Sequence, residues 1–198
     1  MSITTRVRSA LGAVGMFALA LALVAAAGAS TVDRSSTTAR AAGGTLTVGL
    51  AEEPDALDPT LARTFVGRIV FLSLCEKLYD INAKLDIVPQ LAASLPKVSG
   101  GGKTVTIALR KGIKFNDGTP FNAAAVKVSL DRHKSLARSA RASELTPVDS
   151  VTTSGASTVV LHLSAPFAPL TSLLADRAGM IMSPAALNAS ANFAANPV

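Results

Sequence analysis

A long uncharged stretch lies near the start of this chain and decides which residues are available to the fold. No charged residue stands between Arg8 and Asp33, and residues 11–27 are almost all Ala, Leu, Val, Gly, Met and Phe. Arg6 and Arg8 give the positive start, followed by an apolar segment and then small residues, as in a secretory signal peptide. We therefore assign residues 1–29 to a signal peptide and leave them out of the fold.

An uncleaved membrane anchor is the alternative for this segment, because the uncharged run approaches the roughly 20 residues that span a bilayer. Small residues suited to a signal peptidase stand at 25–29, and a second such site lies at 39–41. The only cysteine, Cys75, is far from both sites, so we expect a product that is not lipid-anchored. Residues 30–42, rich in Ser, Thr and Ala, predict a disordered lead-in.

Without Arg6 and Arg8, the chain keeps 17 basic and 13 acidic residues, a net charge of +4. This mild excess is not the dense basic patch of a nucleic-acid-binding protein, so we expect no nucleic-acid partner. One basic cluster predicts a solvated helix face and its following loop, the alternative being an anion or partner site. The cluster consists of Lys127, Arg132, Lys134, Arg138 and Arg141.

About 170 residues follow the signal peptide, enough for one domain of ordinary size. With Cys75 as its only cysteine, the chain cannot form an intramolecular disulfide, so export does not imply a disulfide scaffold here. We expect Cys75 to act as a small buried hydrophobe.

Short alternating apolar runs predict β-strands in this part of the chain. They lie at 45–50, 104–109, 148–153 and 159–163, separated by Gly, Pro and charged residues. Asn-Asp-Gly at 116–118 predicts a tight turn, because Gly supplies the positive φ that such turns require. Together with the helices below, the pattern indicates a mixed α/β (α+β) fold.

Apolar residues at helical spacing predict a helix over 65–78. Asn122 is placed to cap a second helix over 123–135, with Val126 and Leu130 facing inward. The first helix is expected to use one apolar face, made of Phe65, Ile69, Leu72, Cys75 and Leu78.

Three shorter features complete the pattern. Residues 79–88 predict a short extended stretch around a turn at Asn82. Residues 170–175 predict a short helix, and Ser183 is placed to cap another one that begins at Pro184.

Catalytic and metal-binding motifs are missing from the sequence. The two histidines, His133 and His162, lie on different predicted elements, and no HExxH, CxxC or Gly-x-Ser-x-Gly is present. Asp55 and Asp58 stand beside prolines, where an aspartate usually bonds its own backbone rather than acting as one of two catalytic carboxylates. We therefore expect a protein that is not an enzyme and has no cofactor.

Four motifs in order carry a family resemblance. They are EEPDALDP at 52–59, CEKL at 75–78 followed by KLDIVPQLAASL at 84–95, LRKGIKFNDGTP at 109–120, and VVLHLSAPF at 159–167. In this order and spacing they resemble the N-terminal part of the bacterial extracellular solute-binding proteins of family 5. That family includes the oligopeptide-, dipeptide- and nickel-binding proteins of ABC importers.

The resemblance covers residues 43–198 and has departures. Leu95 stands where the family usually has Trp, and Lys77 replaces the usual Gly. Family members are also much longer. The resemblance thus implies an incomplete type II periplasmic-binding-protein-like fold, with part of lobe one and a small β-rich subdomain at about 69–177, so we expect a fragment or a truncated product.

The resemblance also implies a function without catalysis. Such proteins close two lobes over a solute and present it to the permease subunits of an ABC importer. We expect a peptide, either an oligopeptide or a dipeptide, as the solute, and a monomer that is periplasmic, or secreted or wall-associated if there is no outer membrane. The alternative is a truncated non-binding remnant, or a structural or interaction module.

Carried over by motif, the ligand contacts of lobe one fall on two stretches. The first is the loop after the first strand, represented by Glu52, and the second is the start of the next helix, at Arg63, Thr64 and Phe65. The alternative for the second stretch is a helix N-terminus that simply faces solvent.

Overall fold

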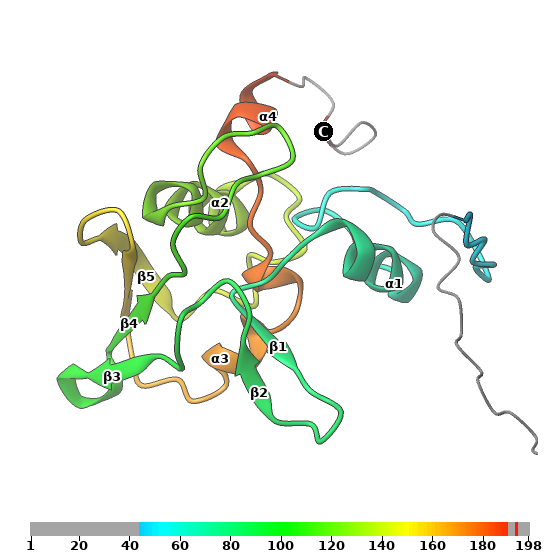
Figure 1. Ribbon diagram of the computed structural model, residues 1–198. Helices are drawn as coiled ribbons and strands as arrows, with labels where there is room; N and C mark the ends of the chain where they lie inside the picture. The colour runs from blue at the N-terminus through cyan, green and yellow to red at the C-terminus, as the bar shows by residue number, and fades with distance from the viewer. Residues whose placement is uncertain (1–43, 190–192, 194–198) are drawn as a thin grey trace, which may run out of the picture. The chain divides into compact units, whose positions relative to one another are not determined.

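The computed structural model describes residues 44–189 and residue 193 (Figure 1). The chain divides into two compact units, Met1–Thr47 and Val48–Val198. The predicted signal peptide and lead-in, residues 1–42, lie outside the described residues. All described helices and strands belong to the second unit.

An antiparallel four-stranded sheet, in the order β3-β4-β6-β5, forms the centre of the second unit. Alternate residues of β4 and β6 are buried, so one face of the sheet packs on the core while the other is half-buried or exposed. Three of its strands confirm the predicted ones. The strands are β3 (Lys97–Ser99), β4 (Thr104–Ala108), β5 (Val148–Thr153) and β6 (Thr158–Leu163).

Helix α2 (Ala123–Ser135) covers the buried face of this sheet against β5 and β6 (Figure 1). As predicted, the Asn122 side chain caps it by accepting a hydrogen bond from the Ala125 amide at 3.0 Å. Val126 and Leu130 are buried, also as predicted. They join a core that includes Ile107, Leu109, Leu145, Val151, Val159, Leu161 and Leu174.

Strands β1 (Tyr79–Ile81) and β2 (Ile87–Pro89) form a separate two-stranded antiparallel hairpin. The predicted turn at Asn82 is confirmed, because its side-chain oxygen accepts hydrogen bonds from the amides of Lys84 and Asp86 at 2.8 and 2.9 Å. This is the local bonding that makes asparagine a turn residue.

Helix α1 (Phe65–Leu74) starts at the predicted residue but ends four residues earlier than predicted. The apolar residues at helical spacing do not all lie on the buried side: Phe65 is 70% and Leu72 65% exposed, while Phe71 is fully buried. The buried residues of α1 are Val66, Gly67 and Phe71, which lie on the side of the helix that faces the rest of the unit.

The predicted strand at 45–50 is also wrong. Residues 44–50 are exposed and form no helix or strand. An alternating pattern becomes a strand only where a neighbouring strand completes its hydrogen bonds, and none of the described residues pairs with this segment.

The C-terminal part of the unit adds α3 (Leu170–Leu173), the 3₁₀ turn η2 (Arg177–Gly179) and α4 (Pro184–Ala189). The predicted cap of α4 is confirmed, since the Ser183 hydroxyl accepts a hydrogen bond from the Ala186 amide at 3.3 Å. Among the described residues, none of the helices is sufficiently long and apolar to span a bilayer.

Candidate functional site

The loop that precedes α1, residues 52–64, is referred to here as the acidic loop. Its Asp55 carboxylate accepts hydrogen bonds from the Arg63 amide at 2.8 Å and from the Thr64 hydroxyl at 2.9 Å. Partial burial works against ionisation, but these hydrogen bonds hold the pKa of Asp55 below its usual value. The loop thus closes on itself, as an aspartate beside proline predicts.

Asp58 ties the acidic loop to α2. Its carboxylate is fully buried and accepts the Thr60 amide at 2.8 Å. The Arg132 guanidinium binds both of its oxygens, at 2.6 and 3.0 Å, from 74 residues away. This paired geometry is the strong, orientation-specific form of an arginine–carboxylate contact.

His133, fully buried on α2, adds a second link to the acidic loop. Its Nε2 lies 3.1 Å from the Met180 carbonyl and its Nδ1 lies 3.0 Å from the Thr60 hydroxyl. A carbonyl only accepts, so Nε2 carries the proton and Nδ1 accepts from Thr60. Burial lowers the pKa of His133 to about 4, which keeps the ring neutral.

Three of the four predicted ligand contacts lie together at the start of α1. Arg63 is exposed and donates to the Arg138 carbonyl at 2.8 Å. The Thr64 hydroxyl caps α1 through the Gly67 amide at 3.2 Å, and the exposed Phe65 ring lies 5.9 Å from the Arg68 guanidinium.

The fourth predicted contact, Glu52, is exposed near the start of the acidic loop. Among the described residues, no hydrogen bond or ion pair connects Glu52 with Arg63, Thr64 or Phe65. The geometry therefore offers a solvent-facing surface made of a guanidinium and an aromatic ring, with a hydroxyl committed to capping.

The basic cluster has partners inside the unit. Besides the Arg132–Asp58 pair, Lys127 binds Asp131 at 2.6 Å and Lys134 donates to a main-chain carbonyl. Arg141 is buried and pairs with Glu144, so the prediction of a wholly solvated face is wrong for this residue. The reason is that α2 and its following loop pack against the acidic loop.

The Asn-Asp-Gly turn has an internal role. The Asp117 carboxylate accepts hydrogen bonds from the Thr119 amide at 2.8 Å and from the Ser183 hydroxyl. The Ser183 and Thr119 hydrogen bonds lower the pKa of Asp117. With Gly118 at φ 82°, the predicted turn is confirmed, and its carboxylate also ties the turn to the cap of α4.

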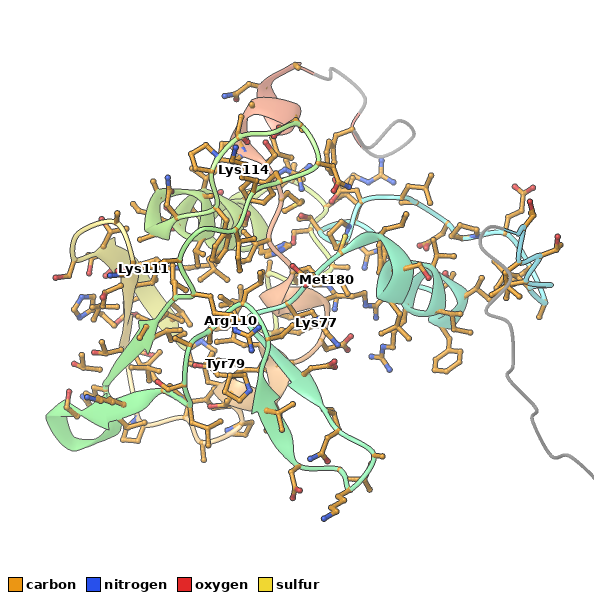
Figure 2. All side chains as sticks on the ribbon, in the orientation of Figure 1. Lys77, Tyr79, Arg110, Lys111, Lys114 and Met180 are labelled. Atoms are coloured by element: carbon orange, nitrogen blue, oxygen red, sulfur yellow. The ribbon has the colours of Figure 1, made fainter. Side chains whose placement is uncertain are left out.

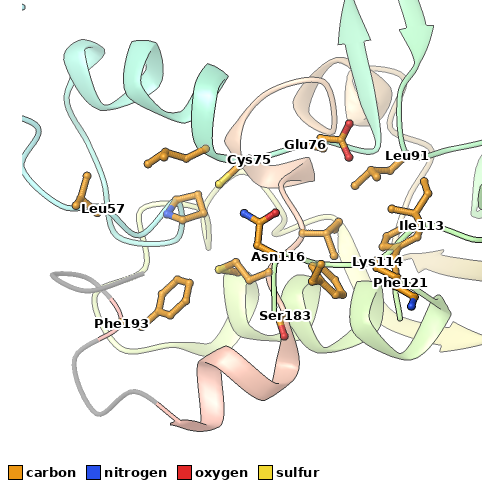
Figure 3. Close-up of a pocket in the computed structure, with 15 residues that line it drawn as sticks. Leu57, Cys75, Glu76, Leu91, Ile113, Lys114, Asn116, Phe121, Ser183 and Phe193 are labelled. Carbon is orange, nitrogen blue, oxygen red and sulfur yellow. The ribbon is translucent and has the colours of Figure 1, made fainter. Parts of the chain in front are cut away.

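A cavity of about 210 Å³ was not anticipated from the sequence (Figure 3). It lies where the acidic loop, the end of α1 and the segments around 113–116 and 181–183 meet. Cys75 lines it half-buried, and burial together with the Asp58 charge raises the pKa of its thiol to about 11. The apolar lining residues are Leu57, Pro59, Leu74, Leu91, Ile113, Phe115, Phe121, Ile181, Met182 and Phe193.

Near the β1–β2 hairpin, the N-terminal and C-terminal parts of the unit are joined side by side. Lys77 and Met180 form a β-bridge there, and the Lys77 ammonium binds Asp80 at 2.6 Å (Figure 2). That pair gives the buried Lys77 ammonium a charged partner. Figure 2 also shows the segment after β4 carrying three basic residues, all of them exposed: Arg110, Lys111 and Lys114.

Among the described residues, no group of three or more His, Cys, Asp or Glu side chains could hold a metal ion. His133 and His162 lie on α2 and β6, the separate elements that were predicted. His162 contacts the Thr152 hydroxyl at 3.0 Å across the sheet.

Comparison with known proteins identifies the family. The family model described as bacterial extracellular solute-binding proteins, family 5 Middle, matches residues 86–198. The glutathione-binding protein GsiB of Escherichia coli O1:K1 / APEC is 38% identical over 132 residues, which cover 66% of this chain and 26% of that protein. Protein XP55 of Streptomyces lividans is 34% identical over 155 residues, covering 76% of this chain and 28% of that protein.

Solved structures agree with the family match. The binding protein AgaA of A. tumefacien R10, in complex with agropinic acid, is 33% identical with a TM-score of 0.65, covering 72% of this chain and 29% of AgaA. The pheromone receptor PrgZ, whose peptide binding has been described, is 26% identical with a TM-score of 0.67, covering 72% of this chain and 32% of PrgZ.

The fold prediction is confirmed: the chain has the mixed helix-and-sheet structure of part of a type II periplasmic binding protein. It spans about a quarter of the length of the curated relatives it matches. By sequence motifs, by the family model and by structural likeness, the chain belongs to family 5 of the bacterial extracellular solute-binding proteins.

Proposed function

We propose that this chain is the N-terminal part of the substrate-binding component of an ABC importer, with peptides as its solutes. The family match over residues 86–198 carries the proposal. Peptide chemistry is favoured because relatives include a glutathione-binding protein and a peptide-binding pheromone receptor. The chain binds and hands over its solute to permease subunits, without catalysis.

The proposed solute contacts are Arg63, Thr64, Phe65 and Glu52. The first three share the exposed start of α1, where a guanidinium can bind a carboxylate and an aromatic face can pack on an apolar group. They form one wall of a cleft whose other wall lies in the part of the fold beyond this chain's match. The subdomain at about 69–177 supports this wall.

We also propose export: residues 1–29 are the signal peptide, and the released monomer lies in the periplasm, or outside the cell where there is no outer membrane. The family description as extracellular supports this placement. Mass spectrometry of the N-terminus of the product exported by its native host tests it. A mature protein that starts within 28–42 is expected, and an intact Met1 would contradict it.

Isothermal titration calorimetry of the purified chain tests solute binding. Glutathione and tri-alanine are expected to bind weakly, with Kd values on the order of 1 mM, because one wall supplies only part of the contacts. Agropinic acid is the non-peptide comparison. Glucose at the same concentration is the control. Heats of binding for glutathione and tri-alanine that do not exceed the heat for glucose would contradict the proposal and favour the non-binding remnant.

A further inference from the structure

The segment that follows α2 forms hydrogen bonds with the acidic loop. The Ala140 amide donates to the Thr60 carbonyl at 2.8 Å, and Arg63 donates to the Arg138 carbonyl at the same distance. Arg141 approaches the Ala62 carbonyl at 3.4 Å. These contacts join two segments that lie more than 70 residues apart in the chain.

A single guanidinium reaches the end of the loop and the start of α1 together. Arg177, at the beginning of η2, is 6% exposed. Its Nη1 donates to the Ala62 carbonyl at 3.0 Å and to the Thr64 carbonyl at 3.2 Å. Because Thr64 is the cap of α1, Arg177 fixes the main chain on both sides of Arg63.

The hydrogen bonds of Arg177 do not compensate for the burial of its charge. In the described part of the chain, both side-chain hydrogen bonds of Arg177 go to neutral carbonyls, and its buried Nε has no partner. The nearby carboxylates Asp176 and Glu144 pair with Arg68 and Arg141 instead. A buried cation near the positive end of a helix dipole is unfavourable.

An apolar residue in place of a buried ionic group is often neutral or stabilising, so stability alone does not account for Arg177. What an apolar residue cannot supply is a donor that sets the position of two carbonyls. A buried polar group of this kind restricts the backbone to one conformation.

We propose that Arg177 is a positioning residue: it holds the main chain from Ala62 to Thr64 so that Arg63, Thr64 and Phe65 present one fixed surface. The role of that surface in solute binding rests on the proposed function. The positioning itself is a property of the free chain and can be measured without a solute.

Amide hydrogen exchange, followed by NMR on the ¹⁵N-labelled chain, tests the proposal. In Arg177→Met, the amides of Arg63 and Gly67 are expected to exchange at least about tenfold faster, because their hydrogen bonds to the loop and cap depend on the fixed backbone. The amides of β4 and β6 are expected to keep their protection.

Two further variants make the result specific. Arg177→Lys restores one donor and is expected to recover part of the protection at Arg63 and Gly67. Lys127→Met, which removes a half-exposed pair on α2, is the matched control and is expected to change neither amide. If Arg177→Met does not fold, Arg177→Lys alone decides: partial loss at Arg63 and Gly67 with an intact sheet supports positioning.

Two outcomes would overturn the proposal. Unchanged exchange at Arg63 and Gly67 in Arg177→Met would show that the side chain only fills space. An equal loss of protection in the loop and the sheet would show a merely structural role. The proposed function is tested separately. If the exchange pattern follows the expectation but the chain does not bind glutathione, the proposed function fails and the positioning role of Arg177 stands.

Discussion

Acid is expected to weaken the fold through His133. Its ring is fully buried, and its pKa is about 4 in the folded chain, against about 6.5 when it is unfolded. Between these values the unfolded state binds the proton and the folded state does not. Stability is therefore fully present above the unfolded pKa and is lost as the pH falls toward the folded one.

The size of the effect follows from the shift. A difference of about 2.5 pKa units between the folded and the unfolded chain corresponds to a total change of about 3 kcal/mol in the free energy of unfolding. About 2 kcal/mol of this is lost between about pH 7 and about pH 4.5. Urea unfolding monitored by circular dichroism at a series of pH values measures it.

The variant His133→Gln separates this group from the carboxylates. Gln keeps a donor for the Met180 carbonyl and an acceptor for Thr60, but it does not titrate. The variant starts less stable at neutral pH, and its deficit relative to the parent is expected to shrink by about 2 kcal/mol on going to about pH 4.5. A deficit that stays constant across this range would show that protonation of His133 does not destabilise the folded chain.

Three further perturbations have expected outcomes, each measured by urea unfolding. Asp58→Asn leaves the partly exposed Arg132 guanidinium without its charged partner and is expected to cost about 3 kcal/mol, whereas combining it with Arg132→Met should cost less than the two separate losses together; additive losses would deny the pairing. Ile107→Ala in the core is expected to cost about 2–5 kcal/mol, against under about 0.5 kcal/mol for the exposed Val98→Ala, and equal costs would place the core elsewhere. Gly102→Ala introduces a Cβ at φ 89° and 2.8 Å from a proline side-chain carbon, so a loss of more than about 1 kcal/mol is expected, and an unchanged midpoint would contradict the turn geometry.

Local signals in the sequence predicted much of the fold. Asn122 as a cap, the Asn82 turn and the strands at 104–109 and 148–153 depend on neighbouring residues, and neighbours are visible in a sequence. The strand at 45–50 failed for the opposite reason, because a strand also needs distant partners.

Choices that depend on packing could not be predicted. Helix α1 carries apolar residues on two faces. The spacing of these residues predicts a helix, but it does not show that Phe71 rather than Leu72 is buried. The Asp58–Arg132 pair joins residues 74 positions apart, and a sequence shows an acidic loop and a basic cluster without showing that they meet.

The candidate ligand contacts were predicted only through family motifs, and they stay a prediction. Nothing in the composition distinguishes Arg63 from the other arginines, and its contact with the Arg138 carbonyl joins residues 75 positions apart. Thr64 carried a usable local signal, since a threonine ahead of an apolar helical run is a typical cap.

We propose that solutes bind this chain at the start of α1, and mapping the chemical shifts of its backbone amides tests this binding without a further assumption. With glutathione added to the ¹⁵N-labelled chain at concentrations up to the order of 10 mM, saturable shifts are expected at Glu52, Arg63, Thr64 and Phe65. Arg63→Ala should reduce them, while Lys103→Ala, in the exposed turn before β4, should not. Saturable shifts confined to other residues, or none at all, would contradict the claim.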